Sequence, residues 1–307
     1  MNEYILRTHQ LSKKYRNDIA LVDINISIKK GEIYGFIGQN GAGKSTMLRI
    51  ATGLVFPSNG SIELFGNDNP NKLTEAQKRI GAIIESPALF PNMTARENLE
   101  VHRLHKGIPG KDCIRKTLEL VGLSDTGKKK AKNFSLGMKQ RLGLAISLLS
   151  DPEFLILDEP TNGLDPMGIV ELRKLIKKLN REKGLTVLIS SHILSELHQL
   201  ANHYGIIHKG ELLEEISAKE LDEKCRQHLR IKVDQPAKGA TVLETSLSTA
   251  NFEVMPDGTM KLYSHLDEVR KVSKALTENG LIIEHLAQNG DSLESYFSKL
   301  VGGEEHA

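Results

Sequence analysis

The chain has 307 residues, enough for one large domain and a second, smaller one. Its 41 Lys and Arg residues nearly balance its 39 Asp and Glu residues, and this small net charge of +2 argues against a general nucleic-acid binder, which would carry a clear basic excess. Hydrophobic residues make up 39% of the chain, so it can build a packed core.

The first two thirds of the chain alternate between expected strands and helices. Residues 22–28 alternate apolar and polar side chains, which predicts a half-buried strand. Short apolar runs predict further strands at 33–37, 61–65, 80–84, 154–157 and 186–190. Helical patterns are expected at 44–53, within 94–122, and at 138–149 and 167–183. This alternation is typical of a layered α/β domain, which we place at residues 1–217.

The sequence changes character after Gly210, and residues 218–307 are expected to form a small α+β accessory domain. Strands are predicted at 229–233, 252–255 and 260–263, and Pro256-Asp257-Gly258 has the composition of a hairpin turn. Leu266, Val269, Val272 and Leu276 follow helical spacing. Ser264 is the expected N-cap of that helix, and Gly280 is expected just past its end.

No segment reaches the roughly 18 apolar residues that a membrane-spanning helix needs. Residues 1–10 also lack the apolar run of a signal peptide. We therefore expect a cytoplasmic protein whose role at a membrane would require a partner chain. Cys113 and Cys225 have no metal-binding or redox spacing, so both are expected to be inert thiols.

The strongest chemical signal is a phosphate-binding loop after the strand at 33–37. It fits the pattern G-x-x-x-x-G-K-[ST], whose eight positions are Gly38, Gln39, Asn40, Gly41, Ala42, Gly43, Lys44 and Ser45. Thr46 follows directly and is counted with the nucleotide-binding residues. Its glycines let backbone N–H groups converge on phosphate oxygens. Lys44 is expected to reach the β- and γ-phosphates of a nucleotide, and the Ser45 hydroxyl to bind Mg²⁺. A random chain of this length would match the pattern roughly once in a hundred cases.

A second element of phosphate chemistry is the apolar strand 154–157, which ends in Asp158 and Glu159. An Asp at the end of a buried strand can hold Mg²⁺ at the edge of the sheet. Glu159 follows at a position where it could activate a water molecule. Many buried strands end in acidic residues, so this pattern is informative only together with the phosphate loop.

The segment before that strand reads Phe-Ser-Leu-Gly-Met-Lys-Gln from Phe134 and resembles the signature motif of ABC ATPases, usually written LSGGQ. Ser135 and Gly137 match the motif, whereas Leu136 and Met138 depart from it. Ser135 is also a plausible helix N-cap, and both roles can hold because capping N–H groups also bind phosphate.

Further matches follow in the order of the ABC family. Tyr15 stands where the family has an aromatic residue that stacks on adenine. Residues 162–165, Asn-Gly-Leu-Asp, resemble the D-loop, and His192 resembles the switch histidine. A lone Tyr or His is more often structural, so these assignments depend on the other motifs.

The resemblance covers residues 4–216 and implies a P-loop ABC nucleotide-binding domain. Such a domain has a RecA-like core, an antiparallel β subdomain and a helical subdomain, here at about 86–150. The family forms a head-to-tail dimer, which implies that Ser135 and Gly137 contact ATP held by the opposite subunit. It also implies that Asp158 and Ser45 bind Mg²⁺, that Glu159 polarises the attacking water and that His192 contacts the γ-phosphate. The implied partners are a second ATPase subunit and a separate transmembrane permease, which would hold the protein at the inner face of the cell membrane.

Glu85 is a departure that points to a subfamily. ABC ATPases usually have Gln at this position, and the sequence Ile-Ile-Glu-Ser-Pro resembles the bacitracin-export and lantibiotic-immunity ATPases. The segment Leu293–Phe297 resembles the same group. The resemblance places Glu85 on the metal side of the site and implies a peptide antibiotic as the cargo.

Two other classes of function compete with transport. A soluble ABC ATPase acting on ribosomes normally carries two cassettes, but this chain has one phosphate loop. A DNA-repair ATPase would need a long coiled-coil insertion between Lys44 and Ser135, and the segment between them is too short for one. A GTPase would need an Asp to read guanine in the segment 71–74, which here is Asn-Lys-Leu-Thr. The basic run of Lys128, Lys129, Lys130 and Lys132 is either a solvated loop or a contact for the membrane partner or for anionic lipid headgroups.

Overall fold

The computed structural model describes residues 3–290 and 292–302. The chain divides into two compact units, residues 1–218 and 219–307. One large cluster of buried side chains belongs to the first unit and another to the second, so each unit has a hydrophobic core of its own.

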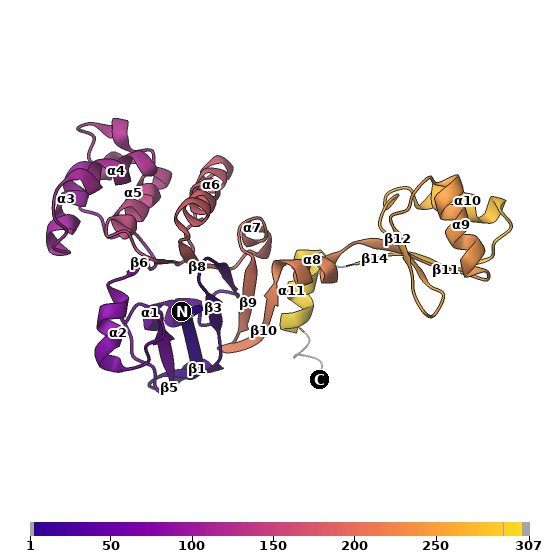
Figure 1. Ribbon diagram of the computed structural model, residues 1–307, viewed down its shortest axis with the longest axis horizontal. Coiled ribbons are helices and arrows are strands. Elements are labelled where there is room, and N and C mark those ends of the chain that lie inside the picture. Colours follow the sequence, from indigo (N-terminus) through magenta and orange to yellow (C-terminus); the bar gives the residue numbers. More distant parts are fainter. Residues whose placement is uncertain (1–2, 291, 303–307) are drawn as a thin grey trace. The chain divides into compact units, whose positions relative to one another are not determined.

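The first unit begins with an antiparallel sheet (Figure 1). Its long strand β1 (Tyr4–Tyr15) pairs with β2 (Asp18–Ile24), β3 (Ser27–Lys29) and β5 (Asn59–Leu64). The single strand predicted at 22–28 is wrong, because Asp23 has a positive φ of 45° and the chain forms two strands on different parts of β1. The alternation of the apolar side chains is confirmed, since Ile24, Ile26 and Ile28 are all buried.

The second sheet of this unit has six strands in the order β10-β9-β4-β8-β7-β6. Four of them were expected from apolar runs. Every residue is buried in β4 (Ile33–Ile37), β7 (Phe154–Leu157) and β8 (Thr186–Ser191), whereas β6 (Ile80–Ile83) has one exposed residue. These pair in parallel with one another and with β9 (His203–His208), while β10 (Glu211–Ser217) adds an antiparallel edge. The strands β9 and β10 were not predicted.

Helix α1 (Lys44–Ala51) lies between the two sheets (Figure 1). Met47, Leu48 and Ile50 are buried in one cluster with Leu6 of β1 and Phe36 of β4. The opposite face of the parallel sheet is covered by α5 (Leu136–Leu148), α6 (Pro166–Lys183) and the short α7 (Leu194–His198). The phosphate loop is therefore attached to a helix that is packed on both sides.

The predicted helical region contains separate helices. The segment 94–122 holds α3 (Ala95–His105) and α4 (Asp112–Leu120), whereas α2 (Pro70–Gln77), which follows β5, lies outside that region and was not predicted. Gly107 and Gly110 have positive φ angles and separate α3 from α4. Thr94 and Glu97 form a capping box at the start of α3. The hydrogen bonds that Glu97 accepts from Thr94, together with the nearby Lys130, lower the pKa of its carboxyl group.

The second unit contains α8 (Ala218–Cys225), β11 (His228–Val233), α9 (Pro236–Ser246), β12 (Phe252–Val254), β13 (Met260–Leu262), α10 (Val269–Glu278), β14 (Ile283–Asn289) and α11 (Leu293–Gly302). From β11 to β14 the order of elements is βαββαβ, and the sheet order is β12-β13-β11-β14. This is the ferredoxin-like arrangement. Both helices, α9 and α10, contribute to the core cluster that covers the sheet, as do alternate residues of β11.

The expected α+β character of the second unit is confirmed, as are its hairpin turn and three of its strands. The N-cap assigned to Ser264 is wrong. Helix α10 begins only at Val269 after Glu268, and the Ser264 hydroxyl instead shares a hydrogen bond of 2.8 Å with the Thr249 hydroxyl. The helix α9 and the strand β14 were not predicted, so the ferredoxin-like topology could not be read from the sequence.

Within residues 3–290 and 292–302, none of the helices combines the length and the apolar character needed to cross a bilayer.

Candidate functional site

The parallel register brings three strand ends to one edge of the sheet. Ile37 of β4 pairs with Ser191 of β8, and Leu157 of β7 pairs with Ile189 of β8. The phosphate loop, the Asp158-Glu159 pair and His192 each directly follow one of these strands. Open parallel sheets bind ligands at this carboxyl edge. The structure therefore brings together the main sequence-predicted residues of the site.

The phosphate loop is built in a way that requires glycine. Gly41 and Gly43 have φ angles of 83° and 108°, which side chains rarely adopt. A Cβ atom at Gly43 would lie 2.5 Å from the Ala20 carbonyl oxygen, and one at Gly38 would lie 2.5 Å from the Ile207 carbonyl oxygen. Neighbouring strands thus enclose the loop and hold its curved backbone.

The first turn of α1 offers an anion site. The helix begins at Lys44, as predicted, and its N-cap Gly43 supplies no side-chain acceptor for the first N–H groups. Such N–H groups, at the positive end of the helix dipole, bind phosphate oxygens well. Ser45 and Thr46 stand in this turn, with Ser45 half-buried and Thr46 buried.

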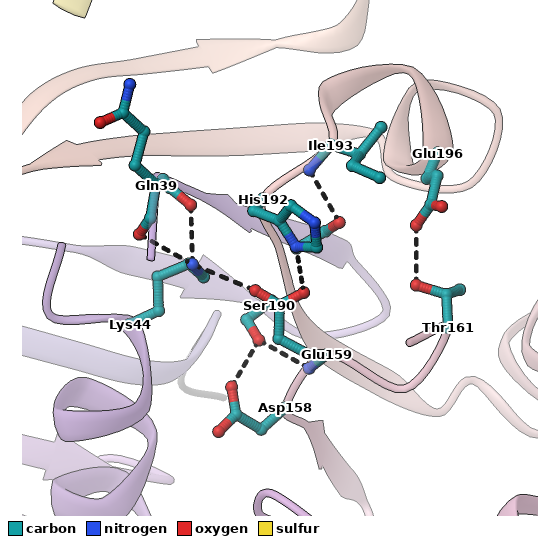
Figure 2. A network of polar contacts seen from close by, with 11 residues as sticks. Gln39, Lys44, Asp158, Glu159, Thr161, Ser190, His192, Ile193 and Glu196 are labelled. Atoms are coloured by element: carbon teal, nitrogen blue, oxygen red, sulfur yellow. Dashed lines mark hydrogen bonds and ion pairs between the residues drawn. The ribbon is translucent and has the colours of Figure 1, made fainter. Parts of the chain in front are cut away.

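Lys44 is held inside the site by acceptors of the protein itself (Figure 2). Its side chain is 5% exposed, and Nζ donates to the carbonyl oxygens of Gly38 at 2.7 Å and Gln39 at 3.1 Å. The same Nζ lies 3.1 Å from Oε1 of Glu159. A buried ammonium group needs such partners. The structure therefore pairs the lysine with the residue expected to activate water.

Glu159 also contacts the predicted switch histidine. Its Oε2 lies 2.8 Å from Nδ1 of His192, while its backbone has a positive φ of 46°. Non-glycine residues rarely adopt this left-handed conformation, and those that do are concentrated at functional sites. The carboxylate of Glu159 thus stands between a lysine and a histidine, which is a suitable position for a group that orients water or moves a proton.

Ser190 of β8 joins the two acidic residues and was missed by the sequence analysis. Its Oγ donates to Oδ1 of Asp158 at 2.7 Å and accepts from the backbone N–H of Glu159 at 2.9 Å (Figure 2). Asp158 and Ser190 are 2% and 0% exposed. The only signal available in the sequence was a polar residue at the end of an otherwise apolar strand.

The donor set fits a magnesium ion held jointly with phosphate. No group of three or more His, Cys, Asp or Glu side chains suited to a metal occurs in the part of the chain that the structure describes. Mg²⁺ does not require one, because it is usually bound by one or two carboxylates, water and substrate phosphates. Asp158 directly follows β7 and Ser45 stands in the first turn of α1, so a carboxylate and a hydroxyl oxygen are available as ligands there.

Glu85 is turned toward a different neighbour. It has a positive φ of 64°, its side chain is 65% exposed, and its carboxylate pairs with the guanidinium group of Arg49 on α1. This ion pair links the phosphate-loop helix to the segment that leads from β6 to the helical region. The metal role expected for Glu85 stays a prediction.

The signature segment begins α5 and lies against the segment 162–165. Ser135 is the N-cap of α5, and its Oγ accepts from the Met138 N–H at 3.3 Å. A Cβ atom at Gly163 would lie 2.7 Å from Leu136, so the two segments touch. A cavity of about 380 Å³ lies between them, lined by Ser135, Gly137, Gly163 and Asp165 among others. Among the contacts described, none joins Ser135 or Gly137 to the phosphate loop of the same chain.

Tyr15 ends β1 at the hairpin to β2 and is 39% exposed. Lys13 lies 4.8 Å from the centre of its ring. The following strand β2 passes the phosphate loop, because Ala20 lies against Gly43. The ring is thus partly exposed with Lys13 over it, and its expected stacking on adenine stays a prediction.

Comparison with known proteins agrees with this geometry. Residues 21–162 match the ABC transporter family. The chain is 46% identical to the bacitracin transport ATP-binding protein BcrA of Bacillus licheniformis, over 97% of this chain and 98% of that protein. It is 46% identical to the lantibiotic transport ATP-binding protein SrtF of Streptococcus pyogenes, over 68% of this chain and 89% of that protein. A dimeric ATP-binding cassette bound to ADP and Pi superposes with a TM-score of 0.63 at 27% identity, covering 69% of this chain and 98% of that one.

Proposed function

The chain belongs to the ABC transporter family as an ATP-binding, ATP-hydrolysing subunit, and from this premise we propose that it energises a separate membrane permease for export of, or immunity to, a peptide antibiotic. The observation that carries the proposal is the meeting of Lys44, Glu159 and His192 at the carboxyl edge of the parallel sheet. The bacitracin and lantibiotic transport relatives support the class of cargo. They give no support to the alternative of a ribosome-acting ATPase.

In the proposed reaction, Lys44 exchanges its protein partners for the β- and γ-phosphates of ATP. This exchange frees Glu159, which then accepts a hydrogen bond from the attacking water and polarises it. His192 keeps its hydrogen bond to Glu159 or contacts the γ-phosphate. Phosphoryl transfer needs little covalent help, so positioning and neutralisation of charge supply most of the catalysis.

We assign magnesium binding to Ser45 and Asp158, with Glu85 as a further residue on the metal side. Bound Mg²⁺ supplies charge neutralisation for the β- and γ-phosphate oxygens. Only Oε1 of Glu85 is paired with Arg49, so its second oxygen, Oε2, could serve the metal side while that ion pair is kept. Tyr15 is assigned to stacking on the adenine ring.

We further infer a head-to-tail dimer of two ATPase subunits. Ser135 and Gly137 line a cavity away from the phosphate loop of their own chain, which is consistent with their binding ATP held by a second copy. The dimeric cassette structure supports this arrangement. The permease partner would hold the dimer at the inner face of the cell membrane.

The test of the function is reconstitution. The purified chain should hydrolyse MgATP, and with its membrane partner in lipid vesicles the rate should rise when bacitracin or a lantibiotic is added. A Glu159→Gln protein in the same vesicles is the matched control. If no member of either antibiotic class changes the rate, the cargo assignment is wrong, although the ATPase assignment stands.

We propose that residues 1–217 form the ATPase domain, with its helical subdomain at about 86–150, and that residues 218–307 form an accessory domain. The buried side chains of the first unit's large core cluster run from Ile5 to Ile207, and those of the second unit's cluster from Leu229 to Leu281. A chain ending at Ser217 should therefore keep its affinity for ATP within about threefold, since the phosphate site lies wholly in residues 1–217. Titration with a fluorescent ATP analogue measures this, with the full-length chain as control. A truncated chain that is folded but does not bind ATP would contradict the division.

A further inference from the structure

The Ser190 hydroxyl contacts both acidic residues of the site at once. Ser190 lies on β8 beside β7 and is fully buried, and the hydrogen bonds described for its hydroxyl go to Asp158 and Glu159 (Figure 2). The strand around it is otherwise apolar at Val187, Leu188 and Ile189. An apolar side chain would fill the same space, so packing alone does not account for a hydroxyl group here.

The chemistry of the hydroxyl sets the direction of both hydrogen bonds. A serine Oγ has one proton to donate and accepts through its lone pairs. The backbone N–H of Glu159 can only donate, so Oγ accepts from it at 2.9 Å and its proton goes to Oδ1 of Asp158 at 2.7 Å. Oδ1 is thereby tied to β8, which holds the plane of the Asp158 carboxylate and leaves Oδ2 available.

The same hydroxyl supports the unusual backbone of Glu159. That residue has a φ of 46°, in a region that non-glycine residues rarely occupy. The hydrogen bond from its N–H to Ser190 anchors this conformation. A single side chain therefore orients the metal-side carboxylate and the carboxylate expected to act on water.

We propose that Ser190 is a positioning residue for metal-dependent hydrolysis, holding Asp158 toward Mg²⁺ and Glu159 toward the attacking water. The proposal rests on the proposed ATPase function. Residues that orient a metal ligand through a hydrogen bond typically change metal affinity or activity by about 10–100-fold when they are replaced. Ser190 does not touch nucleotide in this scheme, so nucleotide binding without metal should not depend on it.

The experiment uses Ser190→Ala and Ser190→Thr in the full chain, with Ser147→Ala as the matched control. Ser147 is also buried, and its hydroxyl donates to the Leu144 carbonyl oxygen in α5, away from both acidic residues. Binding of a fluorescent ATP analogue is measured in EDTA and in Mg²⁺, and ATPase rates are measured across a Mg²⁺ titration. For Ser190→Ala we expect the affinity for the ATP analogue in EDTA to be unchanged. Most of the increase in affinity that Mg²⁺ gives should be lost, and the Mg²⁺ concentration for half-maximal ATPase rate should be roughly tenfold higher. Ser190→Thr, which retains the hydroxyl, should recover most of both.

Two results would overturn the proposal. One is a Ser190→Ala protein with the Mg²⁺ dependence of the unchanged chain. The other is a loss in EDTA as large as the loss in Mg²⁺, which would make Ser190 a part of the general architecture. If the unchanged chain itself fails to bind or hydrolyse ATP, the proposed function fails instead, so the two failures are distinguishable.

Discussion

Glu159→Gln is expected to lower the rate of ATP hydrolysis by about 10²–10⁴-fold while ATP still binds. Gln has nearly the shape of Glu but cannot accept a proton, so the attacking water would no longer be activated. The substitution also removes the anion that pairs with Lys44 at 3.1 Å in the structure. The phosphates of ATP would then no longer compete with a carboxylate for Lys44. Because ATP binds but is not hydrolysed, the ATP-bound dimer should accumulate. Single-turnover hydrolysis and size-exclusion chromatography with MgATP measure the two effects.

A matched control for this substitution is Glu196→Gln. Glu196 accepts a hydrogen bond of 2.7 Å from the Thr161 hydroxyl close to the same site, but it contacts neither Lys44 nor His192 in the described structure. Its hydrolysis rate should stay within a few-fold of the unchanged chain. Full activity in Glu159→Gln would remove Glu159 from its assigned role, and an equal loss in both variants would point to a general disturbance of the site.

Lys44→Ala should weaken ATP binding by about 10–100-fold and bring hydrolysis to background. A hydrogen bond to a charged group contributes about 1.5–3 kcal/mol, and a factor of ten in affinity corresponds to about 1.4 kcal/mol. The Lys44 side chain is only 5% exposed, so bulk solvent has little access to the position of its charge. Equilibrium titration with a fluorescent ATP analogue measures the loss.

The same variant leaves Glu159 without its cation, so its folding must be checked by thermal unfolding. Lys78→Ala is a suitable control, because Lys78 pairs with Glu75 on the surface and exposed pairs contribute little to stability. A folded Lys44→Ala protein that binds MgATP with unchanged affinity would contradict the assigned role of the phosphate loop.

Much of the site could be predicted because its chemistry is local in sequence. A phosphate loop needs glycines at set spacing and a lysine at the start of a helix, and those residues are contiguous from Gly38 to Ser45. The ends of the buried strands were also clear, because runs such as 154–157 are entirely apolar. The pairing of Glu159 with Lys44 and His192 depends on strand register, which the sequence does not state.

The features that could not be predicted from the sequence depend on long-range contacts. Ser190 was indistinguishable from any serine at a strand end until β7 and β8 were seen as neighbours. Helix α9 was not predicted because Gly239 and several Thr and Ser residues have low helix propensity. Pro236 is favourable in the first turn of a helix but does not by itself indicate one. Strand β14 has half-buried residues on both faces, so its alternation is faint.

The topology of the second unit has a consequence for how it joins the chain. Its first strand, β11, and its last, β14, are antiparallel neighbours, with His228 opposite Asn289. The polypeptide therefore enters and leaves the βαββαβ motif at the same end, and the flanking helices α8 and α11 meet there through Lys224 and Tyr296, whose Nζ and hydroxyl oxygen are 3.1 Å apart. A motif whose two ends are adjacent can be inserted, exchanged or removed over evolution. The short gap between the start of β11 and the end of β14 can be closed at little cost in conformational entropy. The pair α8–α11 would then be the frame that remains while the motif between them diversifies.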